Sequence, residues 1–398
     1  MEFQRKNREL HLDSEALATL KMCKEGILSP IDKLQNAKEA QQTDKTSTYK
    51  GQYFPFSFVL APSGKRNENV LKSIKKDDVL DLIIKDEKHG ELIVDESFKI
   101  DRIKRIEKIF STTDLSSPGI ANALKRLGEY AVCGVLKINS DSVKDQKHII
   151  SEQKKLLDAK NVTAIMIAAK PFHRGHERMI RIALEKSDLL VLFLLKPHKK
   201  DLFSYELRHK TLKYFTENFL PKNRVLIVPF ENTYLFEGYD NIMLDSIAAK
   251  NYGCDEIAIG QNHKGIGMHY DRQGTKSVID QFKELDIGIK MEVMSEFVYC
   301  NECKTLVSTR SCPHGRHHHI SFNAELIYAL FCVGILPPAV LMRKELSAII
   351  LSELFPDRLK QLSSKFSNFF PSSGLIEEMD DEKFYMHLIS LHQTVSLT

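Results

Sequence analysis

The sequence has no long uninterrupted apolar run. Its most apolar late stretch, 326–342, is broken by Pro337 and Pro338, and it is too short to cross a bilayer, which requires about 20 apolar residues. The first ten residues are charged and lack the apolar core of a signal peptide. We therefore expect a soluble cytoplasmic protein with no membrane partner.

A disulfide framework and a strong charge bias are also missing. Seven cysteines, an odd number, are spread over 398 residues, which argues against paired cysteines. The chain has 57 basic and 53 acidic side chains and a net charge of +4, which gives no case for nucleic acid as a partner. What is present is 42% hydrophobic residues over a length typical of two or three globular domains.

Residues 1–157 differ in pattern from those that follow. Short apolar or alternating runs, such as 53–60 and 131–138, are separated by turn clusters. This pattern predicts a small β-barrel with a few helices, one of them over 14–25. The charged and weakly helical stretch 141–160 predicts a connector to the next domain.

From residue 161 onward, strand and helix patterns alternate, which predicts βαβ units and a parallel, doubly wound sheet. The expected strands are 162–168, 189–195, 225–228, 256–259 and 289–293, and the expected helices are 177–186, 205–219, 240–252 and 273–285. Ligands of such sheets bind beyond the carboxyl ends of the strands. Near the end of the chain, 320–334 and 344–354 are further helix candidates.

The first motif lies where the strand 162–168 gives way to a helix. His173, Gly175 and His176 follow Pro171 in this turn. A helix N-terminus offers free N–H groups and the positive end of the helix dipole. Gly175 permits close approach of the backbone, and the two imidazoles can donate hydrogen bonds to phosphate oxygens. We interpret the turn as a cradle for a nucleoside triphosphate; the alternative is a pair of surface histidines at the start of an ordinary helix.

A second glycine-rich loop follows the expected strand 256–259. Its glycines permit close backbone approach, and its polar side chains supply hydrogen-bond donors. The residues concerned are Gly260, Gln261, Asn262, His263, Lys264, Gly265 and Gly267. The alternative is a polar turn without a ligand. Because both loops follow strands of one parallel sheet, we expect them at the same edge.

A third motif contains cysteines with the spacing of a metal site. Cys300, Cys303 and Cys312 are followed by His314 and by a histidine run at 317–319. This spacing favours a closed tetrahedral Cys3His zinc site over free thiols, and four protein ligands indicate a structural role. The fourth ligand is His314 or one of the histidines at 317–319.

Together these motifs resemble those of the sulfate adenylyltransferase (ATP sulfurylase) family, in its bacterial and archaeal zinc-containing branch. Residues 171–177 match the family's Pro-x-His-Arg-x-His-Glu nearly residue for residue. Other similar segments are 26–30, 111–119, 250–254 with 260–263, and the cysteine cluster.

The resemblance implies a fold and an activity. The implied fold is α/β: a PUA-like β-barrel domain over 1–157, a Rossmann-like nucleotidylyltransferase domain over 158–295, a zinc-binding segment over 296–320 and a helical region over 321–398. The implied reaction converts ATP, with Mg²⁺, and sulfate to adenylyl sulfate and pyrophosphate in an enzyme that associates with copies of itself. His173, His176 and Lys170 would act on the phosphates and the acceptor. Nucleotide binding would involve Pro171, Gly175, Gly260, Gln261, Asn262, His263 and Gly265.

The acceptor-binding residues of the family are replaced in this chain. Its Gln-Thr-Arg-Asn aligns with 167–170, its Gly-Arg-Asp-His with 260–263, its Arg-Tyr-Ala-Gly-Pro-Arg-Glu with 235–241, and its Ile-Ser-Gly-Thr-x-x-Arg with 320–326. Bidentate arginines bind a dianion strongly, so we expect a rewritten acceptor pocket that includes Ile167, Ala169 and Lys264. Lys170 and Lys264 would restore part of the charge.

Three hypotheses follow from these motifs and departures. The chain is a sulfate adenylyltransferase, or a related nucleotidylyltransferase that uses another acid or nucleotide, or a catalytically silent nucleotide-binding or partner subunit.

Overall fold

The computed structural model describes residues 8–198, 203–260, 285, 287–358, 360–361 and 379–392. The chain forms two compact units, which we describe separately. Unit 1 consists of Met1–Met166, Leu195–His198 and Val228–Val293. Unit 2 consists of Ile167–Leu194, Lys199–Ile227 and Met294–Thr398.

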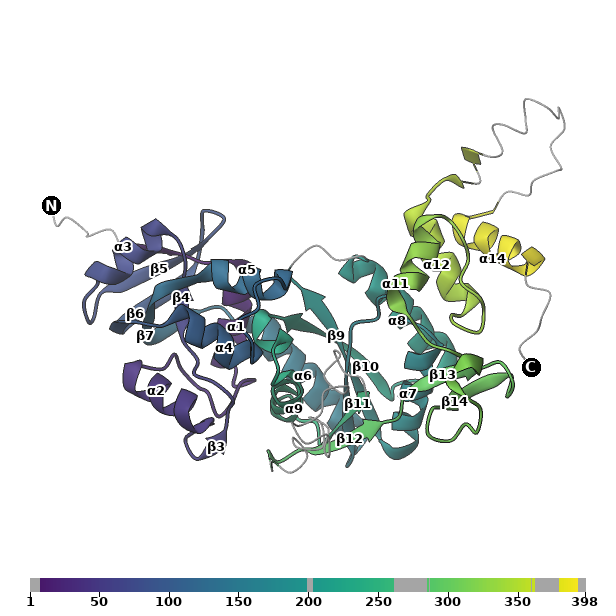
Figure 1. Ribbon diagram of the computed structural model, residues 1–398, viewed down its shortest axis with the longest axis horizontal. Helices are drawn as coiled ribbons and strands as arrows, with labels where there is room; N and C mark the ends of the chain where they lie inside the picture. The colour runs from purple at the N-terminus through teal and green to yellow at the C-terminus, as the bar shows by residue number, and fades with distance from the viewer. Residues whose placement is uncertain are drawn as a thin grey trace. The chain divides into compact units, whose positions relative to one another are not determined.

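Unit 1 contains a five-stranded sheet in the order β1-β5-β6-β7-β4 (Figure 1). Its strands are β1 (Arg8–His11), β4 (Leu60–Pro62), β5 (Val79–Ile84), β6 (Glu87–Lys99) and β7 (Leu127–Ile138). β1 pairs with β5 in parallel, and the other pairs are antiparallel. Alternation buries Leu80 and Leu82 of β5 on the same face, because successive side chains of a strand point to opposite sides.

Six helices and a short hairpin complete the first part of unit 1. They are α1 (Ser14–Lys24), α2 (Ala37–Thr46), β2 (Thr48–Tyr49), β3 (Gln52–Tyr53), α3 (Lys65–Ser73), α4 (Arg102–Phe110), α5 (Pro118–Arg126) and α6 (Asp141–Leu156). α1 begins where the sequence predicted, because Asp13 caps it by accepting a hydrogen bond from the backbone N–H of Ala16 at 2.8 Å. The charged stretch 141–160 does form a helix, α6.

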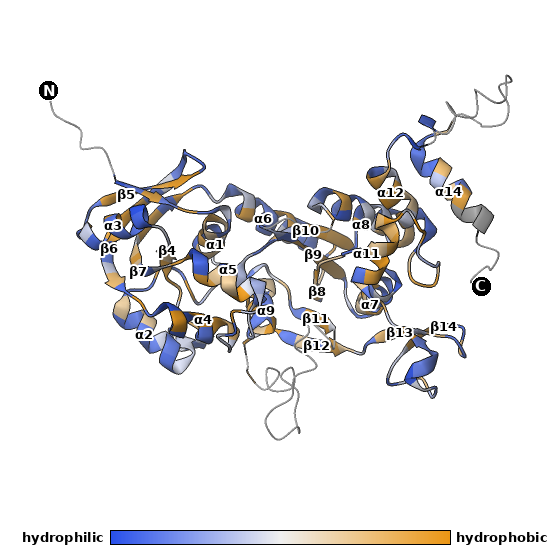
Figure 2. Ribbon diagram, turned by 45° about the horizontal axis from the view of Figure 1, so that its top comes forward, coloured by the Kyte–Doolittle hydropathy of each residue, from blue (hydrophilic) through white to orange (hydrophobic). Residues whose placement is uncertain are grey.

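A second five-stranded sheet has the order β10-β9-β8-β11-β12. Its strands are β8 (Val162–Ile167), β9 (Leu189–Pro197), β10 (Val225–Asn232), β11 (Glu256–Gly260) and β12 (Lys290–Met294). The order reverses at β8, which pairs with β11 in parallel, and this is the arrangement of a doubly wound fold. All six residues of β8 are buried, and β8 and β9 are predominantly apolar (Figure 2).

Helices follow the strands of this sheet as the alternation predicted. They are α7 (Arg174–Lys186), α8 (Tyr205–Phe219), the 3₁₀-helix η1 (Tyr234–Glu237) and α9 (Asn241–Asn251). α7 begins three residues earlier than expected, because His173 caps it. The helix predicted over 273–285 lies, except for residue 285, outside the described residues.

Among the described residues, the last part of unit 2 contains a small sheet and the helices α11, α12 and α14. These elements are β13 (Phe297–Cys300), β14 (Thr305–Ser308), β15 (His319–Ile320), α11 (Ala324–Cys332), α12 (Lys344–Leu354) and α14 (Asp381–His392). α12 packs against α8 and α14. The prediction of a helix from residue 320 was wrong at its start, because Ile320 belongs to β15 and Asn323 caps α11 by accepting from the N–H of Leu326. Within the described ranges, no helix is both long and apolar enough to span a membrane.

Candidate functional site

The turn between β8 and α7 ends in a reciprocal cap formed by two histidines. His173 Nδ1 accepts a hydrogen bond from the backbone N–H of His176 at 3.4 Å, and His176 Nδ1 accepts one from the N–H of His173 at 3.3 Å. This is a capping box in which imidazoles replace the usual Ser or Thr and Glu. It fixes both rings at the N-terminus of α7.

The cap also determines which ring nitrogen carries the proton. A neutral imidazole has one donor and one acceptor nitrogen, so two accepting Nδ1 atoms place the proton on Nε2 of each ring. Burial lowers the pKa of His176 to about 4. Burial and the neighbouring His176 lower the pKa of His173 well below its ordinary value. Both rings are therefore neutral at pH 7, and each has an Nε2–H donor.

Backbone donors at the start of α7 are largely occupied. The N–H of Arg174 donates to the carbonyl of Leu341 at 2.9 Å, and the N–H of His176 donates to His173. Among the backbone N–H groups of the first turn, that of Gly175 has no acceptor in the described part of the chain. The donors left for an anion are thus Gly175 N–H and the two Nε2–H groups.

Both imidazoles belong to a column of aromatic rings in unit 2. Phe322 stacks on His173 with ring centroids 4.8 Å apart and an interplanar angle of 8°. His173 stacks on His176 at 3.7 Å, His176 on Phe172 at 5.6 Å, and Phe172 packs against Phe215 at 4.7 Å. The column holds the imidazole planes in place from both sides.

The aromatic column gives Gly175 a second role. A Cβ built there would lie 2.9 Å from Cδ2 of Phe322 and 3.2 Å from Cε1 of His173, which is closer than carbon atoms normally approach. The sequence suggested only that Gly175 admits a phosphate. The structure shows that it also admits the ring of Phe322.

A buried carboxylate joins α7 to the segment that precedes α12. Glu177 is 7% exposed. Arg343 binds it in a bidentate manner, with Nη2 at 2.6 Å from Oε1 and Nε at 2.9 Å from Oε2. Arg174 and Arg181 approach the same carboxylate at 3.2 and 3.1 Å. Although burial acts to raise it, the pKa of Glu177 is lowered, chiefly by Arg343. Three guanidinium groups therefore surround one carboxylate, and Glu345 is a further acidic group that acts on Arg174.

Sequence reasoning missed two contributors to this site, Phe322 and Arg343. The sequence could have indicated Phe322, since this residue stands where the family motif has glycine. Nothing in the sequence indicated that Arg343 pairs with Glu177, because the two residues are 166 positions apart.

Two of the three predicted acceptor residues, Ile167 and Ala169, have apolar side chains, and the third, Lys264, lies outside the described residues. Ile167 and Ala169 are 2% and 1% exposed, and neither side chain can bind an oxyanion. Ala169 has a left-handed backbone (φ 50°), a conformation that costs of order 1 kcal/mol without glycine. The buried Arg208 braces this turn by donating from Nη1 to the carbonyl of Ala168 at 2.6 Å and from Nε to that of Phe203 at 3.3 Å. Lys170 is partly exposed, and Pro171 is buried.

The glycine-rich loop can be followed only at its start. Gly260 is the last residue of β11. Gln261, Asn262, His263, Lys264 and Gly265 lie outside the described residues, and their predicted roles stay predictions.

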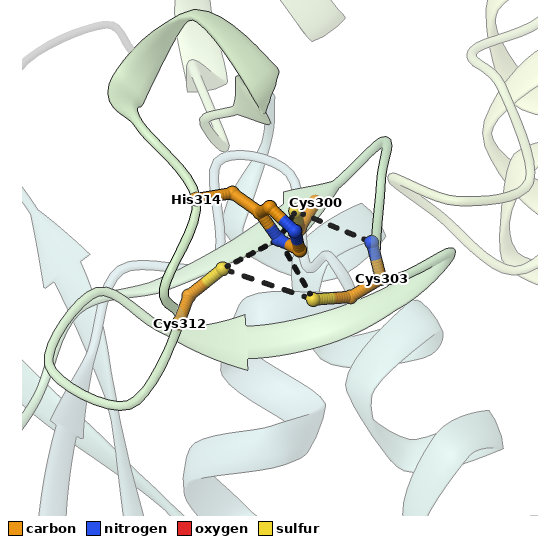
Figure 3. A group of neighbouring side chains, drawn as sticks. All are labelled: Cys300, Cys303, Cys312 and His314. Carbon is orange, nitrogen blue, oxygen red and sulfur yellow. Dashed lines mark hydrogen bonds between the residues drawn. The ribbon is translucent and has the colours of Figure 1, made fainter.

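The cysteine motif gathers four side chains in unit 2 (Figure 3). The ligand atoms of Cys300, Cys303, Cys312 and His314 all lie within 4.8 Å of one another. The sulfurs of Cys303 and Cys312 are 3.8 Å apart, and His314 Nδ1 lies 3.5, 3.3 and 3.7 Å from the three sulfurs in chain order. A tetrahedral zinc ion with ordinary bond lengths requires about 3.8 Å between sulfurs and about 3.6 Å between sulfur and nitrogen. The group therefore fits a closed metal site of this kind.

Of the histidines in this segment, it is His314 whose ring joins the sulfurs. His318 Nδ1 instead lies 3.3 Å from Oε1 of Glu302, and His319 is in β15, where it is paired with Cys300. Among the alternatives left open by the sequence, the geometry favours His314 as the fourth member of the group.

Comparison with known proteins agrees with these motifs. A family model described as ATP-sulfurylase matches residues 141–353, and one described as a PUA-like domain matches residues 1–141. The chain belongs to the ATP-sulfurylase family. The two matches confirm the family, the α/β fold class with its PUA-like first domain, and the enzyme class, nucleotidyltransferase, that the sequence predicted.

Relatives of this ATP-sulfurylase family member share about a quarter of its residues. The sulfate adenylyltransferase of Chloroflexus aurantiacus is 26% identical over 349 residues, which cover 86% of this chain and 90% of the relative. That of Psychrobacter sp. is 26% identical over 330 residues, or 79% of this chain and 77% of the relative.

A solved structure shares the fold. The hexameric APS kinase from Thiobacillus denitrificans superposes with a TM-score of 0.64 and 15% identity. The alignment covers 88% of this chain but 64% of the solved chain, which is less than two thirds of its length.

Proposed function

We propose that the chain is a sulfate adenylyltransferase, which converts ATP and sulfate to adenylyl sulfate and pyrophosphate. The observation that carries this proposal is the reciprocal cap of His173 and His176 directly after the central strand of a doubly wound sheet. The named relatives, which are sulfate adenylyltransferases, support the choice of reaction.

In the proposed reaction the histidines hold the leaving group. The β- and γ-phosphates accept hydrogen bonds from the Nε2–H groups of His173 and His176 and from the N–H of Gly175. A sulfate oxygen bonds to the α-phosphorus in line, and the bond from that phosphorus to the bridging oxygen breaks. Pyrophosphate leaves with the electron pair. The chain would then catalyse the reaction by positioning the two substrates and by stabilising the charge that develops on the phosphates, without a covalent intermediate.

The remaining predicted residues complete this proposal. Lys170 and Pro171 lie in the turn before the histidines, and Lys170 places a cation near the reacting phosphate. Mg²⁺ enters with ATP as part of the substrate. The loop that begins at Gly260 supplies nucleotide contacts from Gln261, Asn262, His263 and Gly265, with Lys264 on the acceptor side.

Neutral imidazoles distinguish this mechanism from one based on charged histidines. Because the pKa of His176 is about 4 and that of His173 is well below its ordinary value, the donors persist from pH 6 to pH 9. The affinity for ATP should therefore stay level over this range as far as these two groups are concerned. Binding through imidazolium ions would instead weaken above pH 6.5.

The reaction is tested by pyrophosphate release from ATP and Mg²⁺ with a panel of acids. The panel contains sulfate, selenate, molybdate and several carboxylates. We expect release with sulfate, and a loss of roughly a hundredfold or more in His173→Ala and His176→Ala, because each removes one donor to the leaving group. His387→Ala, which removes an exposed histidine from α14, is the matched control and should keep full activity. Sulfate-dependent release that survives both substitutions would refute the assigned role of the histidines.

A second candidate, transfer of the adenylyl group to a different acid, is favoured by Ile167 and Ala169. Both are buried and apolar, where the family has Gln and Arg. Pyrophosphate release with a carboxylate but not with sulfate would favour this candidate. ATP binding without release for any acid would favour a silent nucleotide-binding subunit.

We further propose that the Cys3His group holds a structural Zn²⁺. Four protein ligands leave no position open for substrate, so the ion would stabilise the β13–β15 region rather than react. A homo-oligomer in the cytoplasm is also proposed, since the similar APS kinase structure is described as hexameric. Light scattering of the purified chain tests the oligomer.

A further inference from the structure

We propose a second ligand site, independent of the adenylyl transfer proposed above: a cavity in unit 1 that binds a small organic carboxylate through Arg105. The cavity has a volume of about 70 Å³, which exceeds several times the space that one water molecule requires. α1, α4, α5 and η1 contribute to its lining. All of its lining residues belong to unit 1, whereas the paired histidines belong to unit 2.

The walls of the cavity are mainly apolar. Leu20, Leu60, Ile106 and Ala123 are among the lining residues, and each is at most 7% exposed. Such walls exclude a strongly hydrated ion on its own and favour a ligand with a hydrocarbon body.

Three charged residues, Asp13, Arg105 and Arg126, interrupt these apolar walls. Arg105 is 5% exposed, and its guanidinium lies 5.7 Å from the ring centroid of Phe56. Nη1 donates to Ser57 Oγ at 2.8 Å. Nε is buried and has no hydrogen-bond partner. Ser57 is the one hydrogen-bond partner of this guanidinium among the residues described.

The charge of Arg105 is only indirectly compensated. Ser57 Oγ donates onward to Asp44 Oδ2 at 3.1 Å, so the nearest linked carboxylate is one hydroxyl away, and the described ranges contain no ion pair to Arg105. The other arginine of the lining, Arg126, forms a bidentate pair with Asp13 at 2.7 and 2.8 Å. Arg105 is therefore the cation in this cavity that lacks a direct counterion.

These features together specify the ligand class. A buried charge is unfavourable unless it is paired, and the edge of a guanidinium formed by Nε and Nη2 matches the two oxygens of a carboxylate. A monocarboxylate with an aliphatic or aromatic body would pair with Arg105 and place its apolar part against the leucine and isoleucine walls.

The test is calorimetric titration of the full chain with butyrate, hexanoate and benzoate, and with 1-hexanol as an uncharged probe. We expect saturable binding of at least one carboxylate and binding of hexanol weaker by roughly tenfold to a hundredfold, which is the usual range for a charge-assisted pair. Arg105→Met, which keeps most of the length but removes the charge, should reduce carboxylate affinity by a similar factor.

Two further variants separate binding from folding. Lys104→Met removes an exposed cation from the same helix and should leave carboxylate affinity unchanged. Ala123→Met fills the cavity while Arg105 is retained, and it should abolish binding even if Arg105→Met fails to fold. Absence of carboxylate binding to the unmodified chain would overturn the proposal, as would equal binding of hexanoate and hexanol or full binding by Ala123→Met. None of these outcomes depends on pyrophosphate release, so this proposal and the proposed reaction can fail separately.

Discussion

The substitution Gly175→Ala tests whether the aromatic column, and not only a phosphate, requires glycine at this position. The added Cβ would lie 2.9 Å from Phe322 Cδ2, so the ring must move. Overpacking of this kind costs about 1–3 kcal/mol, and a lost ring stack adds about 0.5–1.5 kcal/mol. Alanine recovers at most about 1 kcal/mol of helix propensity. We therefore expect a net destabilisation of about 1–2 kcal/mol.

The same substitution should be neutral or mildly stabilising when Phe322 is already alanine, because the main obstacle is gone. The assay is a double-mutant cycle on free energies of unfolding from urea denaturation, with an expected coupling of about 2 kcal/mol. Gly119→Ala is the matched control: Gly119 is also the second residue of its helix, α5, but its Cβ would meet no atom closer than 3.9 Å. Equal effects of Gly175→Ala in both backgrounds would refute the reasoning.

Three other perturbations test the remaining features. Glu177→Gln should destabilise the protein by about 3 kcal/mol, because three guanidinium groups lose their buried anion, whereas Glu185→Gln on the exposed side of α7 should change little in the same denaturation assay. Since the folded pKa of Glu177 lies below its ordinary value, its contribution should be present above the pKa of an unfolded glutamate and disappear as the pH falls. The pKa of His176 is about 4 in the folded protein and about 6.5 in the unfolded chain. The unfolded state therefore binds the proton first, and the free energy of unfolding should decrease as the pH falls from 6.5 to 4. A His176→Gln variant with the same pH dependence would contradict this. Metal analysis should find one zinc per chain, lost in Cys303→Ser but retained in Cys332→Ser, and zinc that persists in Cys303→Ser would count against the site.

Local pattern sufficed for the strands of the doubly wound sheet and for several helices, whereas short elements such as α2 to α5 were not predicted. α8 and α12 coincide with the predicted ranges 205–219 and 344–354, because a helical apolar pattern and a clear start or break bound each of them. The start of α7 was missed because histidines rarely serve as helix caps. The succession of strand, turn and helix around His173 was predicted correctly, since these elements are contiguous in sequence.

Contacts between distant parts of the chain were beyond such reasoning. Phe322 and His173 stack although the elements from α7 to β15 separate them in sequence, and no pattern in either segment indicates the other. The choice of His314 over the histidines at 317–319 likewise depends on how the loop folds around three sulfurs. The role proposed for Arg105 could not be predicted from the sequence, because it depends on the cavity that surrounds the guanidinium and not on the neighbours of Arg105 along α4.

The hydrogen bonds around Glu177 limit where the chain can be truncated. The backbone N–H of Arg174 donates to the carbonyl of Leu341, and the carboxylate of Glu177 is paired with Arg343. A shortened chain that stops after α11 would lose Arg343 and leave the buried Glu177 with Arg174 and Arg181 as its remaining ion-pair partners among the described residues. A fragment that keeps all three arginines around Glu177 must therefore extend through Arg343, which lies 166 residues after Glu177 in sequence.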